Sequence, residues 1–429
     1  MGVKQYRFIP QFNDEEAILR RQLEGVRWTV RHARSSPQYK ARLDAAAVRP
    51  EDITSLDDVR RLPLSSAEDL RAGYPLPLLS IPERDIVRIH ASSGTTGKRK
   101  ILAYSRRDVD NFALQMARCY EMAGLTTADR IQIAVGYGLW TAGAGFQAGS
   151  ELFGALTVPV GPGNLDIHLQ MLEDMGTTCF CATASMALLL AEETARSGIL
   201  DKIKLRTIIF GSETCSDKMR AAFERALRLE SSYDIGGMTE MYGPGASIEC
   251  EAHQGLHYWP DLFYLEVVNP DTLEPVEAGQ VGEMVVTTLC KEAAPLIRYR
   301  TRDLTRLLPG VCPCGLNLPR HDRIHARSDD MFIVRGVNIY PGQIMDVLAH
   351  FPELGGEYHI TLNRINSRDC MELAVERHSG VSPDLDEALA ARVAEQLHLK
   401  LLIRSRVNIV EYGNLPRAVS KSKRVTDLR

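Results

Sequence analysis

The sequence has 429 residues, of which 45% are apolar and 25% are charged, and these proportions are typical of soluble globular proteins. The net charge of −4, with an isoelectric point near 6.3, argues against bulk binding of nucleic acid. No stretch approaches the ~20 apolar residues of a membrane-spanning helix, and the N-terminus lacks the apolar segment of a secretory signal. Nine scattered cysteines, an odd number, argue against a secreted disulfide framework and predict a reducing, cytoplasmic location.

The first half of the chain alternates between helical and strand-like patterns. Residues 1–75 are predicted to be largely helical, because apolar residues recur at near-helical spacing between charged ones. A strand over 85–91 runs into a glycine-rich loop, and a helix over 106–124 follows it. Apolar runs then alternate with helical stretches from about 130 to 215, which is typical of βαβ units and a parallel sheet.

The second half changes character twice. Residues 260–310 predict a β-meander, and a smaller α+β unit follows residue 330. The predicted fold class is therefore α/β, with a large N-terminal domain of parallel sheets, helices and a small barrel-like meander over 1–328. A small α+β domain over 329–429 completes the chain.

The loop HASSGTTGKRK, over 90–100, is too small and polar to build a core. It is not a Walker A loop, because its two glycines are only three residues apart and arginine follows the lysine. Its backbone N–H groups, hydroxyls and ammonium nevertheless suit a polyphosphate, although a flexible surface loop is the plainer alternative. The residues of this predicted anion site are Ser92, Ser93, Gly94, Thr95, Thr96, Gly97 and Lys98.

Five motifs occur in the order known from the adenylate-forming superfamily of acyl-CoA synthetases, luciferases and nonribosomal adenylation domains. SSGTTGK resembles its phosphate loop, YDIGGMTE (233–240) its D-x-Y-G-x-T-E motif and YRTRDL (299–304) its ribose-binding segment. ARSDDMFIVRGVNIYP (326–341) resembles its hinge, and LPRAVSKSKRV (415–425) its C-terminal lysine motif. GYGLWTAGAG, GLHYW and RGVNIYP resemble the phenylacetate–CoA ligase branch more closely, and the likeness covers nearly the whole chain.

The resemblance implies an enzyme that activates a carboxylic acid with ATP as an acyl-adenylate, releases pyrophosphate, and passes the acyl group to coenzyme A. It implies that Glu240 holds Mg²⁺, that Thr239 bonds the α-phosphate and that Asp303 accepts the ribose hydroxyls. A surface ion pair is the alternative role of Asp303. The other nucleotide-binding residues that the resemblance implies are Gly211, Ser212, Glu213, Asp234 and Arg327.

Two half-reactions imply two arrangements of a mobile C-terminal domain. The resemblance makes Asp329 the hinge, Lys421 the catalytic lysine of adenylation, and Arg335 and Gly336 the face that meets the pantetheine of coenzyme A. Two neighbours of Lys421 in the same basic tail, Lys423 and Arg424, are rival candidates.

The aromatic segment GYGLWTAGAG is predicted to form the acyl pocket with the turn over 235–244, although aromatic residues in a helix start are as often core. Gly236 stands where the superfamily commonly has the tyrosine that packs against adenine. The base is then held less well, another ring replaces the tyrosine, or the acyl pocket is larger and takes a substituted aryl acid. The predicted pocket residues are Tyr137, Trp140, Gly143, Phe146, Gly236, Gly237, Met238 and Pro244.

Cysteines and histidines at two places predict a metal site. The C-P-C-G turn supplies Cys312 and Cys314, and an upstream segment supplies Cys250 and His257, with His253 as the alternative to His257. Four such ligands suit a closed, structural zinc site, whereas a free-thiol turn is the alternative.

The sequence leaves several choices open. The acyl group could pass to an amine or a carrier protein in place of coenzyme A, and another oxyanion could be activated in place of a carboxylate. A non-catalytic binding protein and an ADP-forming kinase or ATPase are the rival classes, although the chain lacks the kinase motifs H-R-D and D-F-G. The oligomeric state is also open, with a homodimer as one option.

Overall fold

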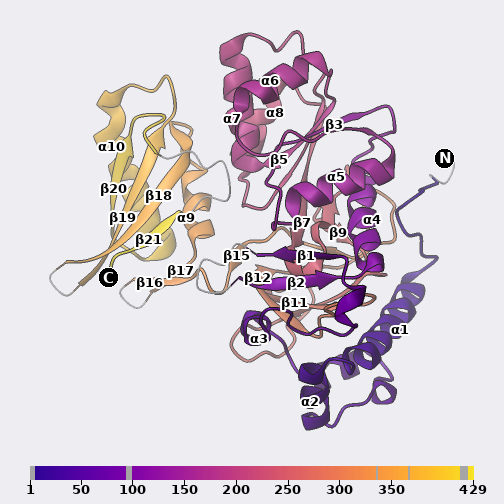
Figure 1. Cartoon of the computed structure of the whole chain (residues 1–429). Coiled ribbons are helices and arrows are strands. Elements are labelled where there is room, and N and C mark those ends of the chain that lie inside the picture. Colours follow the sequence, from indigo (N-terminus) through magenta and orange to yellow (C-terminus); the bar gives the residue numbers. More distant parts are fainter. Residues whose placement is uncertain (1–4, 93–98, 335–336, 366–367, 416–423) are drawn as a thin grey trace. The chain divides into compact units, whose positions relative to one another are not determined.

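The computed structural model describes residues 5–92, 99–334, 337–365, 368–415 and 424–429. Its elements are shown in Figure 1. The chain forms two compact units, and each is described by itself. Unit 1 comprises Met1–Ala182, Ile199–Ser212 and Leu229–Arg323, and unit 2 comprises Thr183–Gly198, Glu213–Arg228 and Ile324–Arg429.

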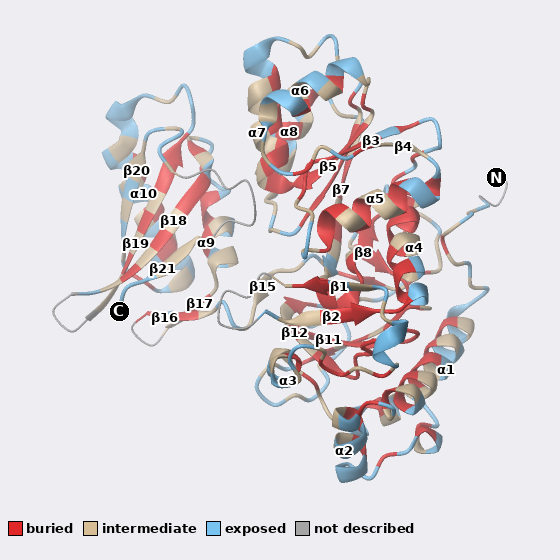
Figure 2. Cartoon of the chain, in the orientation of Figure 1, coloured by how far each residue is buried: buried red, intermediate tan, exposed pale blue. Residues whose placement is uncertain are grey.

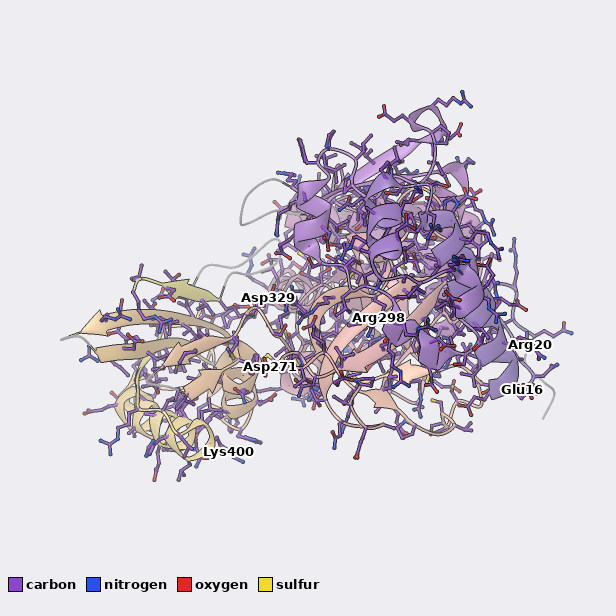
Figure 3. The ribbon with its side chains drawn as sticks, turned by 90° about the horizontal axis from the view of Figure 1, so that it is seen from below. Glu16, Arg20, Asp271, Arg298, Asp329 and Lys400 are labelled. Atoms are coloured by element: carbon purple, nitrogen blue, oxygen red, sulfur yellow. The ribbon has the colours of Figure 1, made fainter. Side chains whose placement is uncertain are left out.

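The N-terminal region of unit 1 is helical, as the sequence predicts. The Asp14 side chain caps its longest helix by accepting a hydrogen bond from the N–H of Ala17 at 2.8 Å. Glu16 and Arg20, labelled in Figure 3, mark the exposed side of this helix. Val26 and Val30 lie on its fully buried side. The helices are α1 (Glu15–Ala33), α2 (Pro37–Ala45) and α3 (Ala67–Ala72).

A nine-stranded mixed sheet forms the centre of unit 1, with strand order β13-β14-β9-β8-β7-β6-β5-β3-β4. β3 pairs in parallel with β4 and β5, and β6 pairs in parallel with β7, whereas β8 and β9 continue the sheet in antiparallel. The parallel part confirms the βαβ pattern of the sequence. β5 and β6 are buried along their whole length, which explains their unbroken apolar sequences. The strands are β3 (Arg130–Ile133), β4 (Leu156–Val158), β5 (Cys179–Thr183), β6 (Thr207–Gly211), β7 (Ser231–Met238), β8 (Gly243–Glu249), β9 (Leu256–Tyr258), β13 (Leu307–Leu308) and β14 (Arg320–His321).

Three helices of unit 1 connect or cover these strands. They are α4 (Arg106–Met122), α5 (Ala142–Phe153) and α6 (Leu165–Asp174). Figure 2 shows that α4 and α5 turn mostly buried residues toward the sheet, whereas α6 presents an exposed face. The predicted helix over 106–124 is confirmed, with its end two residues earlier.

The predicted meander is also present in unit 1. β10 (Phe263–Val268), β11 (Gly282–Thr288) and β12 (Tyr299–Thr305) pair in antiparallel order. The separate hairpin of β1 (Arg88–Ala91) and β2 (Ile101–Tyr104) flanks the glycine-rich loop.

Unit 2 contains the predicted C-terminal α+β domain. A four-stranded sheet of order β20-β19-β18-β21 packs on α9 and α10 around an apolar core that includes Ile344, Leu362, Leu373 and Val393. Two helices from earlier in the chain, α7 (Ala184–Ser197) and α8 (Asp217–Leu227), also belong to this unit. Its other elements are β15 (Ala326–Arg327), β16 (Phe332–Val334), β17 (Val337–Ile339), α9 (Pro341–Leu348), β18 (Leu354–Ile365), β19 (Arg368–Arg377), α10 (Asp386–Leu401), β20 (Ser405–Val410) and β21 (Val425–Asp427).

Candidate active site and a cysteine–histidine cluster

The β1–β2 hairpin holds the two ends of the glycine-rich loop together. Ala91 lies opposite Ile101, and the N–H of Ser92 donates to the carbonyl of Lys100 at 3.1 Å. The predicted phosphate-binding residues from Ser93 to Lys98 lie outside the described residues. The hairpin therefore fixes where this loop leaves and re-enters the fold.

Thr239 and Glu240 form a buried turn directly after β7. The hydroxyl of Tyr104 donates to the carbonyl of Thr239 at 2.7 Å, and the ammonium of Lys291 donates to the carbonyl of Glu240 at 2.8 Å. Lys291 is fully buried, and its ammonium lies 4.9 Å from the ring centre of Tyr104. Burial lowers the pKa of Lys291 to about 8. These contacts fix the backbone of the turn.

The Glu240 carboxylate has its own cation. Its Oε1 atom lies 2.5 Å from the ammonium of Lys100 and accepts a hydrogen bond from the hydroxyl of Tyr299 at 3.0 Å. Burial opposes ionisation of this carboxyl, but the charge and hydrogen bond of Lys100 outweigh it, so the pKa of Glu240 lies below its usual range. Glu240 is therefore a buried, ionised oxygen donor.

His90 lies on β1, two residues before Ser92, and is 2% exposed. Its ring stacks on Phe112 at 5.4 Å between centres, and its Nδ1 donates to the carbonyl of Leu139 at 3.2 Å. Burial lowers the pKa of His90 to about 4, although the bond to Leu139 opposes this shift. The imidazole is thus neutral near neutral pH and links the loop to the aromatic segment.

The predicted acyl-binding segment packs against the G-P-G turn, which is formed by residues 243–245 at the start of β8. A Cβ on Gly145 of α5 would lie 2.7 Å from the ring of Pro244, so only glycine allows this approach. A Cβ on Gly143 would lie 2.6 Å from the ring of Tyr137, and burial raises the pKa of the Tyr137 hydroxyl to about 12. Phe146 is buried, and its carbonyl accepts a hydrogen bond from a tyrosine of α4.

The remaining predicted pocket residues come from the aromatic segment and from β7, and they differ in exposure. The ring of Trp140 covers Gly136, Gly237 is exposed and Met238 is half-buried at the end of β7.

Gly236 faces a hydroxyl across the sheet. It pairs with Ser247 of β8, whose Oγ would clash with a Cβ at position 236. The Ser247 hydroxyl is itself bonded to Nε2 of the buried His321 at 2.8 Å. The space next to the glycine backbone is therefore occupied by the Ser247–His321 pair, so a side chain at position 236 would have to displace it.

The predicted nucleotide-binding residues lie in both units. Gly211 ends β6 and Ser212 follows it directly. The N–H of Asp234 on β7 donates to the Glu249 carboxylate at 3.0 Å, and Asp303 lies on β12. Glu213 belongs to unit 2.

The hinge and lysine motifs belong to unit 2. Arg327 donates to the Asp329 carboxylate at 2.9 and 3.0 Å. Arg335, Gly336 and Lys421 lie outside the described residues. Arg424, a rival of Lys421, instead pairs with Glu357 at 3.4 Å and stacks over the ring of a neighbouring tyrosine.

The structure brings together the four side chains of the predicted metal site. The ligand atoms of Cys250, His257, Cys312 and Cys314 all lie within 4.8 Å of one another. Nδ1 of His257 lies 3.2 Å from the carbonyl of Leu318, and its Nε2 lies 3.5 Å from the sulfur of Cys314. The other histidine, His253, instead lies 3.2 Å from a carboxylate oxygen of Glu249.

Comparison with known proteins adds to this geometry. A family model described as AMP-binding enzyme matches residues 19–290, and one described as AMP-binding enzyme C-terminal domain matches residues 336–429. The chain belongs to the AMP-binding enzyme family. The resemblance that the sequence motifs indicate is confirmed.

Relatives in this family match along nearly the whole chain. Phenylacetate-coenzyme A ligase of Escherichia coli (strain K12) is 40% identical over 416 residues, which cover 95% of this chain and 94% of the relative. The enzyme of the same name from Thermus thermophilus is 38% identical over 411 residues, which cover 92% of each chain. A crystal structure of 2-hydroxyisobutyryl-CoA ligase in the postadenylation state, in complex with 2-HIB-AMP, has a TM-score of 0.87 at 29% identity and covers 97% of this chain and 90% of that one.

Five residues around Glu240 and Gly236 were not predicted individually from the sequence. Lys100, Lys291 and Tyr299 contact Glu240 from positions far along the chain, and Ser247 and His321 fill the space beside Gly236. Lys100 could have been noted as the last cation of the K-R-K run after the loop. Tyr299 is the first residue of the YRTRDL motif, whereas Lys291, Ser247 and His321 carry no signal in sequence spacing.

Proposed function

We propose that this protein, an AMP-forming acid–coenzyme A ligase, activates an aromatic carboxylic acid. One oxygen of the acid attacks the α-phosphorus of ATP, pyrophosphate leaves, and the thiol of coenzyme A then displaces AMP from the acyl-adenylate. The observation that carries the proposal is the loop-bearing β1–β2 hairpin, whose Lys100 contacts the carboxylate of the T-E turn at 2.5 Å. Such an arrangement suits a nucleotide tail and its metal.

Glu240 fits a magnesium ligand because it is an ionised carboxylate held in a fixed turn. When bound, Mg²⁺ would supply positive charge against the phosphate oxygens. Thr239, beside it, would donate its hydroxyl to the α-phosphate, and Asp303 would accept from the ribose. Gly211, Ser212, Glu213, Asp234 and Arg327 complete the proposed nucleotide contacts.

The acid is proposed to bind between the aromatic segment and the G-P-G turn. Tyr137 and Trp140 offer flat apolar faces, and the absence of a side chain at Gly143 allows the Tyr137 ring to pack against α5. The Tyr137 hydroxyl is buried and has no hydrogen-bond partner among the described residues, so it could bond a polar substituent of the acid. This favours a substituted aryl acid.

Zinc is proposed for the cysteine–histidine cluster. Three thiolates and one imidazole are the ligands of closed, structural zinc sites, and their spacing here allows one ion to contact all four. Bound zinc would tie the C-P-C-G turn to β9 and the end of β8. Thiolate ligands also require reduced cysteines, which suits a cytoplasmic location.

We also propose the domain boundary between residues 328 and 329, with Asp329 as the hinge and Lys421 as the adenylating lysine. Lys421→Ala should lower adenylate formation by about 10²–10³-fold and leave thioester formation from preformed adenylate largely intact. Rapid-quench assays of the two half-reactions would show this, and an equal loss of both would remove the role.

The proposed substrate class can be tested with a pyrophosphate-release screen of substituted benzoates, phenylacetates and cinnamates, with and without coenzyme A. We expect turnover with an aromatic acid, AMP as the nucleotide product and an acyl-CoA only when coenzyme A is present. Formation of ADP would contradict the proposal, and so would activity with aliphatic acids alone.

A further inference from the structure

The ion pair with Lys100 occupies a carboxylate oxygen of Glu240, the residue proposed to bind the metal. The two side chains are 18% and 5% exposed, and the ammonium lies 2.5 Å from Oε1. The same oxygen accepts the hydrogen bond from Tyr299 at 3.0 Å. A divalent cation that takes this oxygen would therefore compete with the ammonium of Lys100 for it.

The carboxylate cannot avoid this conflict by moving with its backbone. Tyr104 and Lys291 hold the carbonyls of the turn at 2.7 and 2.8 Å, and Lys291 is fully buried. Lys291 bonds the backbone of Glu240 and not its carboxylate, so its charge remains in place when the metal enters. Of the two ammonium groups at the turn, Lys100 is therefore the one that competes with the metal for the carboxylate.

Lys100 is also well placed to leave. It ends the phosphate loop, and its own carbonyl accepts from the N–H of Ser92 at 3.1 Å, which anchors its backbone while its four-carbon side chain can turn. Lys100 also stands only two residues after Lys98, the last residue of the sequence proposed to bind the phosphates.

We propose that Lys100 is a positioning residue that neutralises Glu240 until the metal–nucleotide complex binds, and then moves from the carboxylate to the phosphates. This inference depends on the proposed role of Glu240 as the metal ligand. It makes metal binding and nucleotide binding favour one another, because the nucleotide offers the displaced ammonium a new anion.

The test is a titration of the enzyme with Mn²⁺ in the absence of nucleotide. The EPR signal of the unbound ion reports the affinity of each variant for Mn²⁺. Lys100→Met removes the competing charge and should bind Mn²⁺ about tenfold more tightly than the wild type, or more tightly still. Lys100→Gln should show the same increase in affinity for Mn²⁺. It keeps a hydrogen-bond donor for Glu240, so it also guards against a loss of folding in Lys100→Met. Lys100→Arg keeps the charge and should stay near the wild-type affinity.

Arg99→Met is the matched control, because it removes the same charge one residue earlier, from an exposed side chain. It should leave the affinity for Mn²⁺ unchanged. Equal affinity of the wild type and both neutral Lys100 variants, all with cooperative melting curves, would overturn the inference.

A further variant, Glu240→Gln, distinguishes an error in the inference about Lys100 from an error in the proposed role of Glu240. If Glu240→Gln binds Mn²⁺ in the presence of α,β-methylene-ATP as well as the wild type does, Glu240 is not the metal ligand and the proposed role fails. If that binding is lost while the Lys100 variants show no gain, the proposed role stands and the inference about Lys100 is wrong.

Discussion

The turn at Glu240 and the cysteine–histidine cluster both gather buried side chains suited to metals, but they differ in what balances those side chains. The Glu240 carboxylate is matched by the ammonium of Lys100, a cation supplied by the chain. In the cluster, three thiols and an imidazole face one another, with the sulfurs of Cys250 and Cys312 3.5 Å apart. A site with its own cation can exchange its ligand during turnover, whereas four converging donors suit an ion that stays bound.

The strongest test of this contrast is Glu240→Gln. A neutral amide cannot balance the metal, so adenylate formation should fall by about 10²–10³-fold. The melting temperature should fall by no more than about 2–4 °C, because the ammonium of Lys100 can turn toward solvent. Burst-phase pyrophosphate release and calorimetry would measure the two effects.

Glu251→Gln is the control for this variant, since it changes an exposed carboxylate in the same unit. Both its activity and its melting temperature should match the wild type. If Glu240→Gln keeps the wild-type rate of adenylate formation but has a much lower melting temperature, Glu240 is structural and the contrast between the two sites is wrong.

Cys314→Ser should lower the stability of the protein and leave its catalytic rate nearly unchanged, the opposite of Glu240→Gln. Loss of one thiolate should lower the bound zinc and reduce the melting temperature by about 5–10 °C, because metal binding contributes to folding. The rate of adenylate formation per folded molecule should stay within about twofold, since the cluster supplies structure and no reacting group. Elemental analysis, calorimetry and active-site titration would check these outcomes.

Cys370→Ser, which lies outside the cluster, is the matched control and should keep its zinc. If folded wild-type protein contains no zinc and Cys314→Ser melts like the wild type, the cluster is a set of free thiols.

The smallest expected effect concerns His90, a buried histidine outside both sites that is neutral at neutral pH. Its folded-state pKa of about 4 lies below the usual value of 6.5, so protons bind the unfolded chain preferentially. The stability that His90 contributes is complete above pH 6.5 and declines as the pH falls toward 4. Across this range the wild type should lose about 2–4 °C of melting temperature relative to His90→Gln. Parallel melting curves of the two proteins at every pH would contradict this.

The sequence predicted those parts of the molecule whose signals are local. The C-P-C-G turn and the nearby Cys250 and His257 indicated the cluster that the structure assembles. The choice between the two histidines needed the structure, because it depends on β9, which carries His257 and pairs with β14. The parallel strands, the meander and the C-terminal α+β domain followed from apolar periodicity.

The parts that escaped prediction depend on contacts between distant residues. Lys100 meets Glu240 across 140 positions of sequence, and Lys291 lies 51 positions from it. The hydroxyl beside Gly236 arises from the register of β7 with β8, which places Ser247 opposite the glycine. No local pattern specifies such pairs, because they are set by how the sheet assembles.

The central claim, that the acid itself attacks the α-phosphorus, can be tested by following one oxygen atom. An aromatic acid labelled with ¹⁸O in its carboxylate should transfer one labelled oxygen to AMP when coenzyme A takes the acyl group, and mass spectrometry would detect it. We predict labelled AMP and unlabelled pyrophosphate. Label found in inorganic phosphate, with ADP as the nucleotide product, would contradict the account.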